Sequence, residues 1–478
     1  LPEFRNPERT QALELLKPSR TDSLPLSMKL TEEGRYQLKT RRYKVVESGV
    51  DRVVFATLLE NGIQITKDIS LQSGKYYFDV AITLQNTTDS EILASYSITV
   101  ANGLYPEIDK ITGLASIAGI DVGKGKTKIA HTDVKDMPYK NESVGITMAG
   151  ATNKYFAAVL KPSVNNRIAA VTSESVKNPD PFYEDDFIVD LHAKRVSILP
   201  QGERRHDYAF FLGPKNNEAL TQCDGLLAIS DYDFGMTRSI CKILVKILNM
   251  FYGVIPNYGV SILLLTFLVK LVLFPLTRKS QMSMVRMQQL QPLIAQLKEK
   301  HKGDKQKVGQ EQMKLFKQHG VNPMSGCFPI LLQLPVFFAL FRTLQNSFEM
   351  RQAPFVSWVT DLSEPDKLLQ LPFTIPFLGE WLNILPLIMG AASFVQMKLT
   401  PKTTGDDPQA RMQQKMMQMM PLIFPVILYN FPSGLTLYWT TSTMISIGEQ
   451  ILIRRSVKKL DIYYKGKRVI DAKAKVKK

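Results

Sequence analysis

The sequence predicts a multidomain fold: an antiparallel β-sandwich followed by an α-helical membrane bundle of five spans with a cytoplasmic helical hairpin. Residues 36–220 alternate apolar and polar side chains over strand lengths, which is typical of half-buried β-strands. Residues 256–455 contain long apolar runs, and the basic segment 279–320 between the first two runs has helical periodicity. Residues 1–35 are expected to form an N-terminal segment or linker.

Five segments carry the clearest strand pattern, namely GIQITKDISL, KYYFDVAITLQN, ILASYSITV, KYFAAVLKP and DYAFFLGP. In the second segment Phe78, Val80 and Ile82 share one face, which we expect to point into a core. Repeated strands with few helical patterns favour an antiparallel sandwich. The histidines of this domain lie near no nucleophile, and the cysteines of the chain are too widely spaced for a metal site. We therefore expect no catalytic group, cofactor or metal.

Five apolar runs in the second half have the character of membrane spans: Ser261–Thr277, Phe328–Leu344, Trp381–Leu399, Met419–Phe431 and Gly434–Ile453. The fourth run is short for a span of about 20 residues. Only the sequence FPSG separates it from the fifth, so a single long helix kinked at Pro432 is an alternative. We favour two spans and a tight turn, because together the two runs are about twice as long as one span.

Loop charge predicts the orientation of these spans. The net charge of the chain is +16, and Lys and Arg gather after the first span, after the third span and in the tail 456–478, whereas the loop after the second span is acidic. Since cytoplasmic loops are enriched in Lys and Arg, these three basic segments are expected in the cytoplasm and the sandwich on the opposite side. Export of the sandwich then requires a segment upstream of Leu1.

An amphipathic helix is predicted over residues 236–255, directly before the first span. Ile240, Ile243, Leu244 and Leu248 recur at helical spacing, and lysines occupy other faces. We interpret it as an interfacial helix that lies on the outer face of the membrane that the spans cross. The alternative is a linker helix packed on the sandwich.

The basic segment 279–320 is predicted to form a helical hairpin. An apolar stripe that includes Met287 and Ile294 runs along its first arm, Asp304 is a candidate N-cap of the second arm, and Gly320 is a plausible stop. Its methionines either form an adaptable binding surface or simply pack the two arms together.

A charged side chain lies within the first span. Lys270 is flanked by apolar residues, and a lysine at mid-depth costs roughly 2.5–3.5 kcal/mol on insertion scales. Polar groups on other spans would reduce this cost by lining a wet cavity around the ammonium. The residues that we assign to such a groove are Lys270, Thr266, Gln333, Gln396, Trp439 and Thr440. For any single threonine, a hydrogen bond back to its own helix is the simpler interpretation, and for Lys270 the alternative is snorkelling to an interface.

Two long motifs carry a resemblance to a known family: NPMSGCFPILLQLPVFFALF, at the second span, and MPLIFPVILYNFPSGLTLYW, over the fourth and fifth. Together with the order of sandwich, interfacial helix, span with a central cation and basic hairpin, they resemble the YidC/Oxa insertases of Gram-negative bacteria. The resemblance covers nearly the whole chain. It implies a multi-pass protein of the bacterial inner membrane, with the sandwich in the periplasm and the C-terminus in the cytoplasm, and no enzymatic activity.

The resemblance also implies a site. In that family a hydrophilic groove, open to the cytoplasm and to lipid, holds an arginine shortly before a Pro-Leu pair. The pair here is Pro275-Leu276, which places Lys270 at the arginine position; the competing match, Arg278, follows the pair. Contacts with the client span are expected along a slide formed by Leu331, Leu334, Phe337, Ile427 and Phe431.

The implied partners are nascent membrane proteins, the Sec translocon, the ribosome and the signal-recognition pathway, with the chain itself mostly monomeric. The basic tail and the hairpin fit a contact with ribosomal RNA, and the tail fits anionic lipid equally well. The alternative function is an ion or small-solute transporter or channel, since a lone intramembrane cation also suits an anion path. No inverted repeat of the spans supports it. A membrane-anchored sugar-binding protein is a third interpretation, because sandwiches of this kind often bind carbohydrate.

Overall fold

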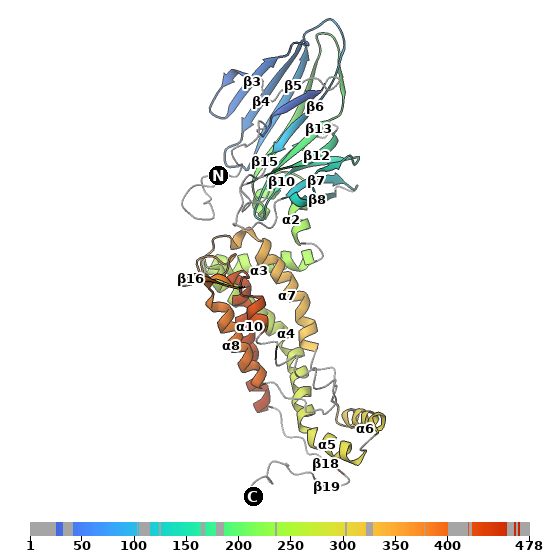
Figure 1. Ribbon diagram of the computed structural model, residues 1–478, viewed down its shortest axis with the longest axis vertical. Helices are drawn as coiled ribbons and strands as arrows, with labels where there is room; N and C mark the ends of the chain where they lie inside the picture. The colour runs from blue at the N-terminus through green and yellow to red at the C-terminus, as the bar shows by residue number, and fades with distance from the viewer. Residues whose placement is uncertain are drawn as a thin grey trace. The chain divides into compact units, whose positions relative to one another are not determined.

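The computed structural model divides into two compact units, residues 1–235 and 236–478 (Figure 1). It describes residues 25–31, 42–102, 104, 115–123, 126–163, 168–177, 186–234, 237–301, 304–321, 328–376, 378–399, 419, 423–456, 463–464 and 467–468.

The first unit is built from two antiparallel sheets. The larger sheet has nine strands in the order β2 (Lys44–Ser48), β3 (Arg52–Leu58), β4 (Ile63–Leu71), β5 (Tyr77–Asn86), β15 (Glu203–Pro214), β11 (Phe156–Pro162), β10 (Ile146–Thr152), β7 (Ala115–Asp121) and β8 (Thr127–Asp133). The second has the order β1 (Met28–Thr31), β6 (Ile92–Ala101), β13 (Asp186–Ala193), β12 (Ile168–Val176) and β9 (Tyr139–Asn141), with β14 (Val196–Ile198) paired to β6. The predicted antiparallel sandwich is confirmed.

The core of this unit lies where β6, β12 and β13 of the smaller sheet pack on β10 and β11 of the larger one. Tyr96, Phe156 and Phe187 are among its largest fully buried side chains. In β5 the side chains of Val80 and Ile82 are buried as their alternation predicts, because successive side chains of a strand point to opposite faces. Two short helices, α1 (Asn217–Thr221) and α2 (Leu227–Phe234), form a second apolar cluster with the larger sheet, in which Leu220 and Ile229 pack with Val159.

A buried lysine ties the two sheets together. Lys67, on β4 of the larger sheet, donates a hydrogen bond of 2.7 Å to the carbonyl of Leu26, just before β1 of the smaller sheet. Its ammonium also lies 4.3 Å from the centre of the Tyr43 ring, within the range of a cation–π contact.

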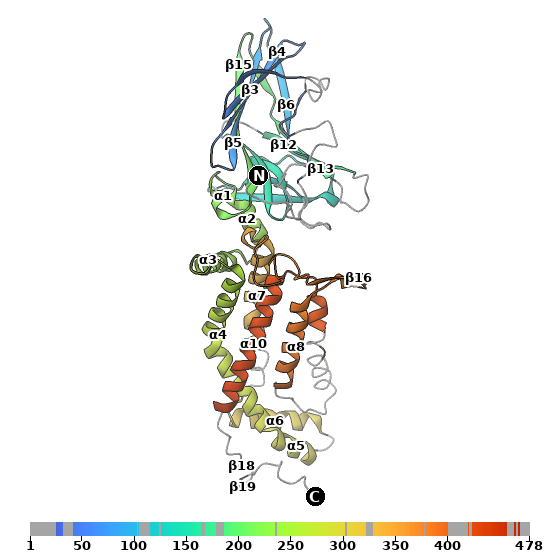
Figure 2. The same cartoon turned by 90° about the vertical axis from the view of Figure 1, so that its left-hand side faces the viewer.

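The second unit is mainly helical (Figure 2). Its elements are α3 (Arg238–Val254), α4 (Tyr258–Gln289), α5 (Gln291–Lys300), α6 (Lys305–Gln318), α7 (Phe328–Asn346), β16 (Leu369–Ile375), β17 (Gly379–Leu382), α8 (Ile384–Leu399) and α10 (Ser433–Ser456), and residues 423–427 are also helical. Helix α10 packs between α4 and α8, while α3 crosses α4 and α7 at one end of the bundle. Cys241 of α3 docks there, with its sulfur 3.3 Å from the Ala339 carbonyl of α7.

Helix α4 is longer than the predicted span, because it continues without interruption through Pro275 to Gln289. The predicted first arm of the hairpin is therefore divided: its beginning belongs to α4 and its end to α5, which starts with Pro292 in its first turn. Proline is well tolerated there, since it lacks the N–H that a helix start leaves unpaired. The second arm is α6, whose N-terminus is capped by Asp304 through the Lys307 N–H at 2.9 Å.

The predicted third span begins later than its apolar run. Trp381 lies in β17, which pairs with β16, and α8 starts only at Ile384. The carboxylate of Asp366 accepts hydrogen bonds from the N–H groups of Ile384 and Leu385 at 2.8 and 2.9 Å, which caps this helix.

Within the described residues, one helix, α4, is both long and apolar enough to cross a membrane, and α8 is a shorter apolar helix. The other expected spans do not reach that standard. Helix α10 interrupts its apolar residues with a run of Thr and Ser, and most of the N-terminal part of the fourth span lies outside the described residues.

Candidate functional site

A polar stripe follows one face of α10 inside the helical unit. Tyr438, Ser442, Ser446 and Glu449 are spaced four, four and three residues apart, so that they lie one above another on the same face. All four side chains are buried. Their burial keeps these polar groups inside the helical unit.

The ammonium of Lys270 meets this stripe. It donates a hydrogen bond of 2.7 Å from α4 to the hydroxyl of Ser446 on α10. The side chain is only half-buried, so the ammonium is held at the α4–α10 contact without being sealed off. Glu449, one turn further along α10, interacts electrostatically with Lys270.

The other predicted groove residues divide into two groups. Gln333 of α7 joins the stripe, since its amide donates a hydrogen bond of 3.0 Å to Ser442. The hydroxyls of Thr266 and Thr440 instead donate to carbonyls of their own helices, of Ile262 at 2.6 Å and of Thr436 at 2.7 Å. Both threonines are buried, so they pack the helices instead of presenting a free hydroxyl. Gln396 lies on α8, half-buried.

An aromatic cluster adjoins the polar stripe. The ring of Trp439 lies between Phe337 of α7, at 4.9 Å, and Phe424, at 5.0 Å. Phe341 joins the cluster on α7, with its ring centre 5.8 Å from that of Phe431. Trp439 thus belongs to an apolar wall rather than to the hydrogen-bonded stripe.

Of the predicted slide residues, the structure brings Phe337 and Phe431 together through the ring of Phe341. Leu334 and Ile427 lie on the surface, 39% and 58% exposed. The side chain of Leu331 lies outside the described part of the chain.

Comparisons with known proteins give the chain its family. A family model described as the YidC periplasmic domain matches residues 2–247, and one described as a 60Kd inner membrane protein matches residues 250–460. The membrane protein insertase YidC of Syntrophobacter fumaroxidans is 33% identical over 90% of this chain and 77% of its own length. The chain belongs to the YidC family of membrane protein insertases.

Other YidC proteins are similarly related. The YidC of a Geobacter species is 33% identical over 90% of this chain and 75% of its own length. A crystal structure of an active YidC insertase with its first transmembrane domain resolved covers 88% of this chain and 82% of its own, at 21% identity and a TM-score of 0.37. The family assignment rests on the sequence matches.

Membership of the YidC family establishes what the chain does. It is a membrane protein insertase, its substrates are nascent membrane proteins, and the family is not enzymatic. Its first unit is a YidC periplasmic domain, so the protein belongs to the inner membrane.

Two polar residues of the helical unit were not assigned to the site from the sequence. Ser446 receives the Lys270 hydrogen bond, and Glu449 contributes the nearby negative charge. Their signal is the spacing from Ser442, at four and seven residues. A search for polar residues at helical spacing along the last apolar run would have found both.

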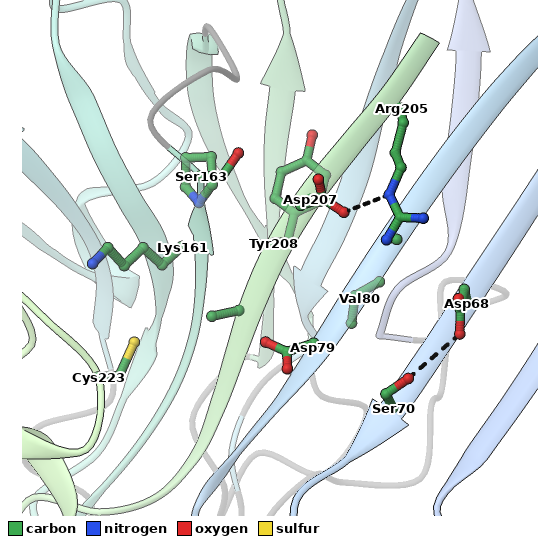
Figure 3. Close-up of a pocket in the computed structure, with 13 residues that line it drawn as sticks. Asp68, Ser70, Asp79, Val80, Lys161, Ser163, Arg205, Asp207, Tyr208 and Cys223 are labelled. Carbon is green, nitrogen blue, oxygen red and sulfur yellow. Dashed lines mark hydrogen bonds and ion pairs between the residues drawn. The ribbon is translucent and has the colours of Figure 1, made fainter. Parts of the chain in front are cut away.

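The YidC periplasmic domain has a separate open groove of about 630 Å³ on the larger sheet (Figure 3). The charged side chains that line it have hydrogen-bond partners. Arg205 donates a hydrogen bond of 2.9 Å to Asp207, and Arg52 donates bidentate hydrogen bonds of 2.9 Å to the carboxylate of Asp68. The Lys161 ammonium donates to a backbone carbonyl. The Arg52 guanidinium holds the pKa of Asp68 below its ordinary value.

Proposed function

We propose that this insertase accepts its clients at a hydrophilic groove formed by α4, α7 and α10, with Lys270 as the groove cation. The observation that carries the proposal is the hydrogen bond from the Lys270 ammonium to Ser446, on a polar stripe that Gln333 extends to α7. A lysine that snorkelled to an interface would turn away from its helical neighbours.

A cation here favours insertion for an electrostatic reason. Moving the polar tail of a client through hydrocarbon is the costly step, and a groove that enters the membrane shortens that path. A positive charge in the groove attracts an acidic tail, and the attraction is stronger at a low dielectric constant than in water. The contact must remain weak enough for the apolar part of the client to leave for the lipid.

The aromatic cluster supports a slide for that apolar part. Phe337, Phe341 and Phe431 form a continuous aromatic surface, and the exposed side chains of Leu334 and Ile427 offer aliphatic contacts to a passing helix. The groove would then bind the acidic tail of a client while the slide contacts its apolar segment.

The surrounding architecture follows from loop charge. Five spans, with α3 on the periplasmic surface of the inner membrane and the α5–α6 hairpin and tail in the cytoplasm, satisfy the enrichment of Lys and Arg in cytoplasmic loops.

Met287 packs into the hairpin core, whereas Met313 is 48% exposed and suits an adaptable contact. The hairpin and tail are our candidates for ribosome and signal-recognition contacts. The Sec translocon and anionic lipid are further partners of a mostly monomeric insertase.

Replacement of Lys270 tests the proposal. In cells depleted of their own YidC, the protein carrying Lys270→Ala should insert a single-span client with an acidic periplasmic tail about tenfold less well, the loss of one charge–charge contact worth about 1.4 kcal/mol. Lys270→Arg should retain insertion because it keeps the charge. The assay is protease accessibility of the client tail.

Lys279→Ala is the matched control, since Lys279 is an exposed lysine of the same helix. A client with a neutral tail should be little affected by Lys270→Ala. Normal insertion of the acidic client by Lys270→Ala would refute the groove proposal.

A further inference from the structure

Glu449 is the unusual residue of the polar stripe. Its side chain is 8% exposed, and its Oε2 atom accepts no hydrogen bond from the described residues. A buried carboxylate is unfavourable unless another group compensates it, so a residue of this kind requires an explanation. Packing alone does not provide one, because a glutamine or a leucine of similar size would fill the same space without the charge.

The group that compensates Glu449 is Lys270. Among the described residues of α3, α5, α7 and α10, which pack against α4, Glu449 is the one charged group that acts electrostatically on the Lys270 ammonium. The two charges do not form a direct ion pair. Ser446, one turn before Glu449 on the same face of α10, takes the hydrogen bond of the ammonium instead.

We propose that Glu449 is the counter-ion of Lys270: a positioning residue that keeps the groove cation charged and directed toward α10 until an acidic segment of a client replaces it. This inference rests on the proposed role of Lys270 in the groove. The chemistry of the occupant is specified by the exchange, since only a group with its own negative charge can take over the compensation.

The presence of lysine rather than arginine gives such a residue a function. A guanidinium remains charged in nearly any environment, whereas an ammonium at a poorly hydrated site can lose its proton. A groove with arginine would stay positive without help, whereas in a groove with lysine a nearby negative charge helps the ammonium to keep its proton. The absence of a direct ion pair also matters, because a tightly paired ammonium would have no attraction left for a client.

The test uses the purified full-length protein in proteoliposomes, with a single-span client whose tail is acidic. Glu449→Gln should shift the loss of insertion with rising pH to a lower pH than in the wild type, because the carboxylate favours the protonated form of the ammonium. At a pH low enough to protonate the ammonium without its counter-ion, the variant should insert the client as well as the wild type does. Glu449→Asp, which keeps the charge, should retain most of the activity.

The decisive variant combines Glu449→Gln with Lys270→Arg. Its insertion efficiency should equal that of the single variant Lys270→Arg at every pH, since a guanidinium does not need the carboxylate to stay charged. A loss in Glu449→Gln that Lys270→Arg does not rescue would mean that Glu449 only supports the helix packing, and would overturn the inference. If Glu449→Gln does not accumulate, the double variant is compared directly with Lys270→Arg, and a deficit overturns the inference equally.

Failure of this inference can be told apart from failure of the groove proposal. Normal insertion by Glu449→Gln at every pH, with insertion lost in Lys270→Ala, would overturn only the counter-ion role. Normal insertion by Lys270→Ala would overturn the groove itself.

Discussion

Lys67 illustrates at the residue scale how this chain accommodates a buried charge outside the membrane. Its ammonium is satisfied by the Leu26 carbonyl and the Tyr43 ring, but by no carboxylate among the described residues. Burial lowers the pKa of Lys67 to about 8. A neutral partner and an aromatic face therefore offset only part of the cost of removing this charge from water.

The stability of the periplasmic domain should consequently depend on pH through Lys67. The folded pKa of about 8 lies below the ordinary 10.5, so the unfolded chain binds this proton more tightly. The free energy of unfolding should therefore rise by about 3 kcal/mol as the pH increases from about 8 to about 10.5.

The Lys67→Met variant should lack this rise. Thermal unfolding of the full-length protein in detergent, followed by the circular dichroism of its β-sheet, would show wild type gaining stability relative to the variant as the pH is raised. Parallel behaviour of the two proteins would argue that the ammonium is better solvated than its burial indicates.

At the scale of elements, α7 is the helix that relates the polar stripe to the slide. Gln333 bonds to α10, while Leu334, the next residue, is exposed on another face, and Phe337 turns to Trp439 one turn later. In the proposed mechanism, one helix would thus offer a client both a polar contact and an apolar surface.

A photo-crosslinker placed on this surface should report passage of the client. Stalled nascent chains with a single span should crosslink to Leu334 and to Phe431. They should not crosslink to Leu340, which lies on the same helix as Leu334 but is 1% exposed. Equal crosslinking at Leu340, or none at Leu334 and Phe431, would contradict the slide.

Element by element, the sequence predicts regular structure better than it predicts partners. The alternation in β5 and the cap at Asp304 depend on neighbours along the chain, and both are found as expected. The pairing of Trp381 in β17 depends on β16 across a turn, and an apolar run cannot reveal it. Thr266 was assigned to the groove because it lies four residues before Lys270, and Thr440 because of its depth. The hydroxyls of both donate to carbonyls of their own helices instead.

The same distinction applies to the whole molecule. The order of sandwich and helical unit, and the cation within the first span, are visible in composition and hydropathy. Ser446 and Glu449 gain meaning only once α10 lies against α4, because the contact joins residues 176 positions apart. Helical spacing can reveal the polar stripe on α10, but a single sequence does not reveal that Lys270 of α4 contacts it.

The basic tail gives a prediction for the molecule as a whole. Removal of residues 456–478 should weaken ribosome binding about tenfold at low salt, and raising the salt should abolish the difference, because contacts of Lys and Arg with phosphates release counter-ions. Cosedimentation with ribosomes measures the effect. Unchanged ribosome binding together with weaker binding to anionic vesicles would assign the tail to lipid instead.

The continuity of α4 has a mechanical consequence. Lys270 and the end of α4 at Gln289, where α5 follows, lie on one uninterrupted helix, about 28 Å apart along its axis at about 1.5 Å per residue. A continuous helix transmits a displacement from one end to the other. Pro275 lacks the N–H for one backbone hydrogen bond between the two points, so α4 bends most easily there. A load on the hairpin must either bend α4 at this proline or tilt the segment that carries the ammonium.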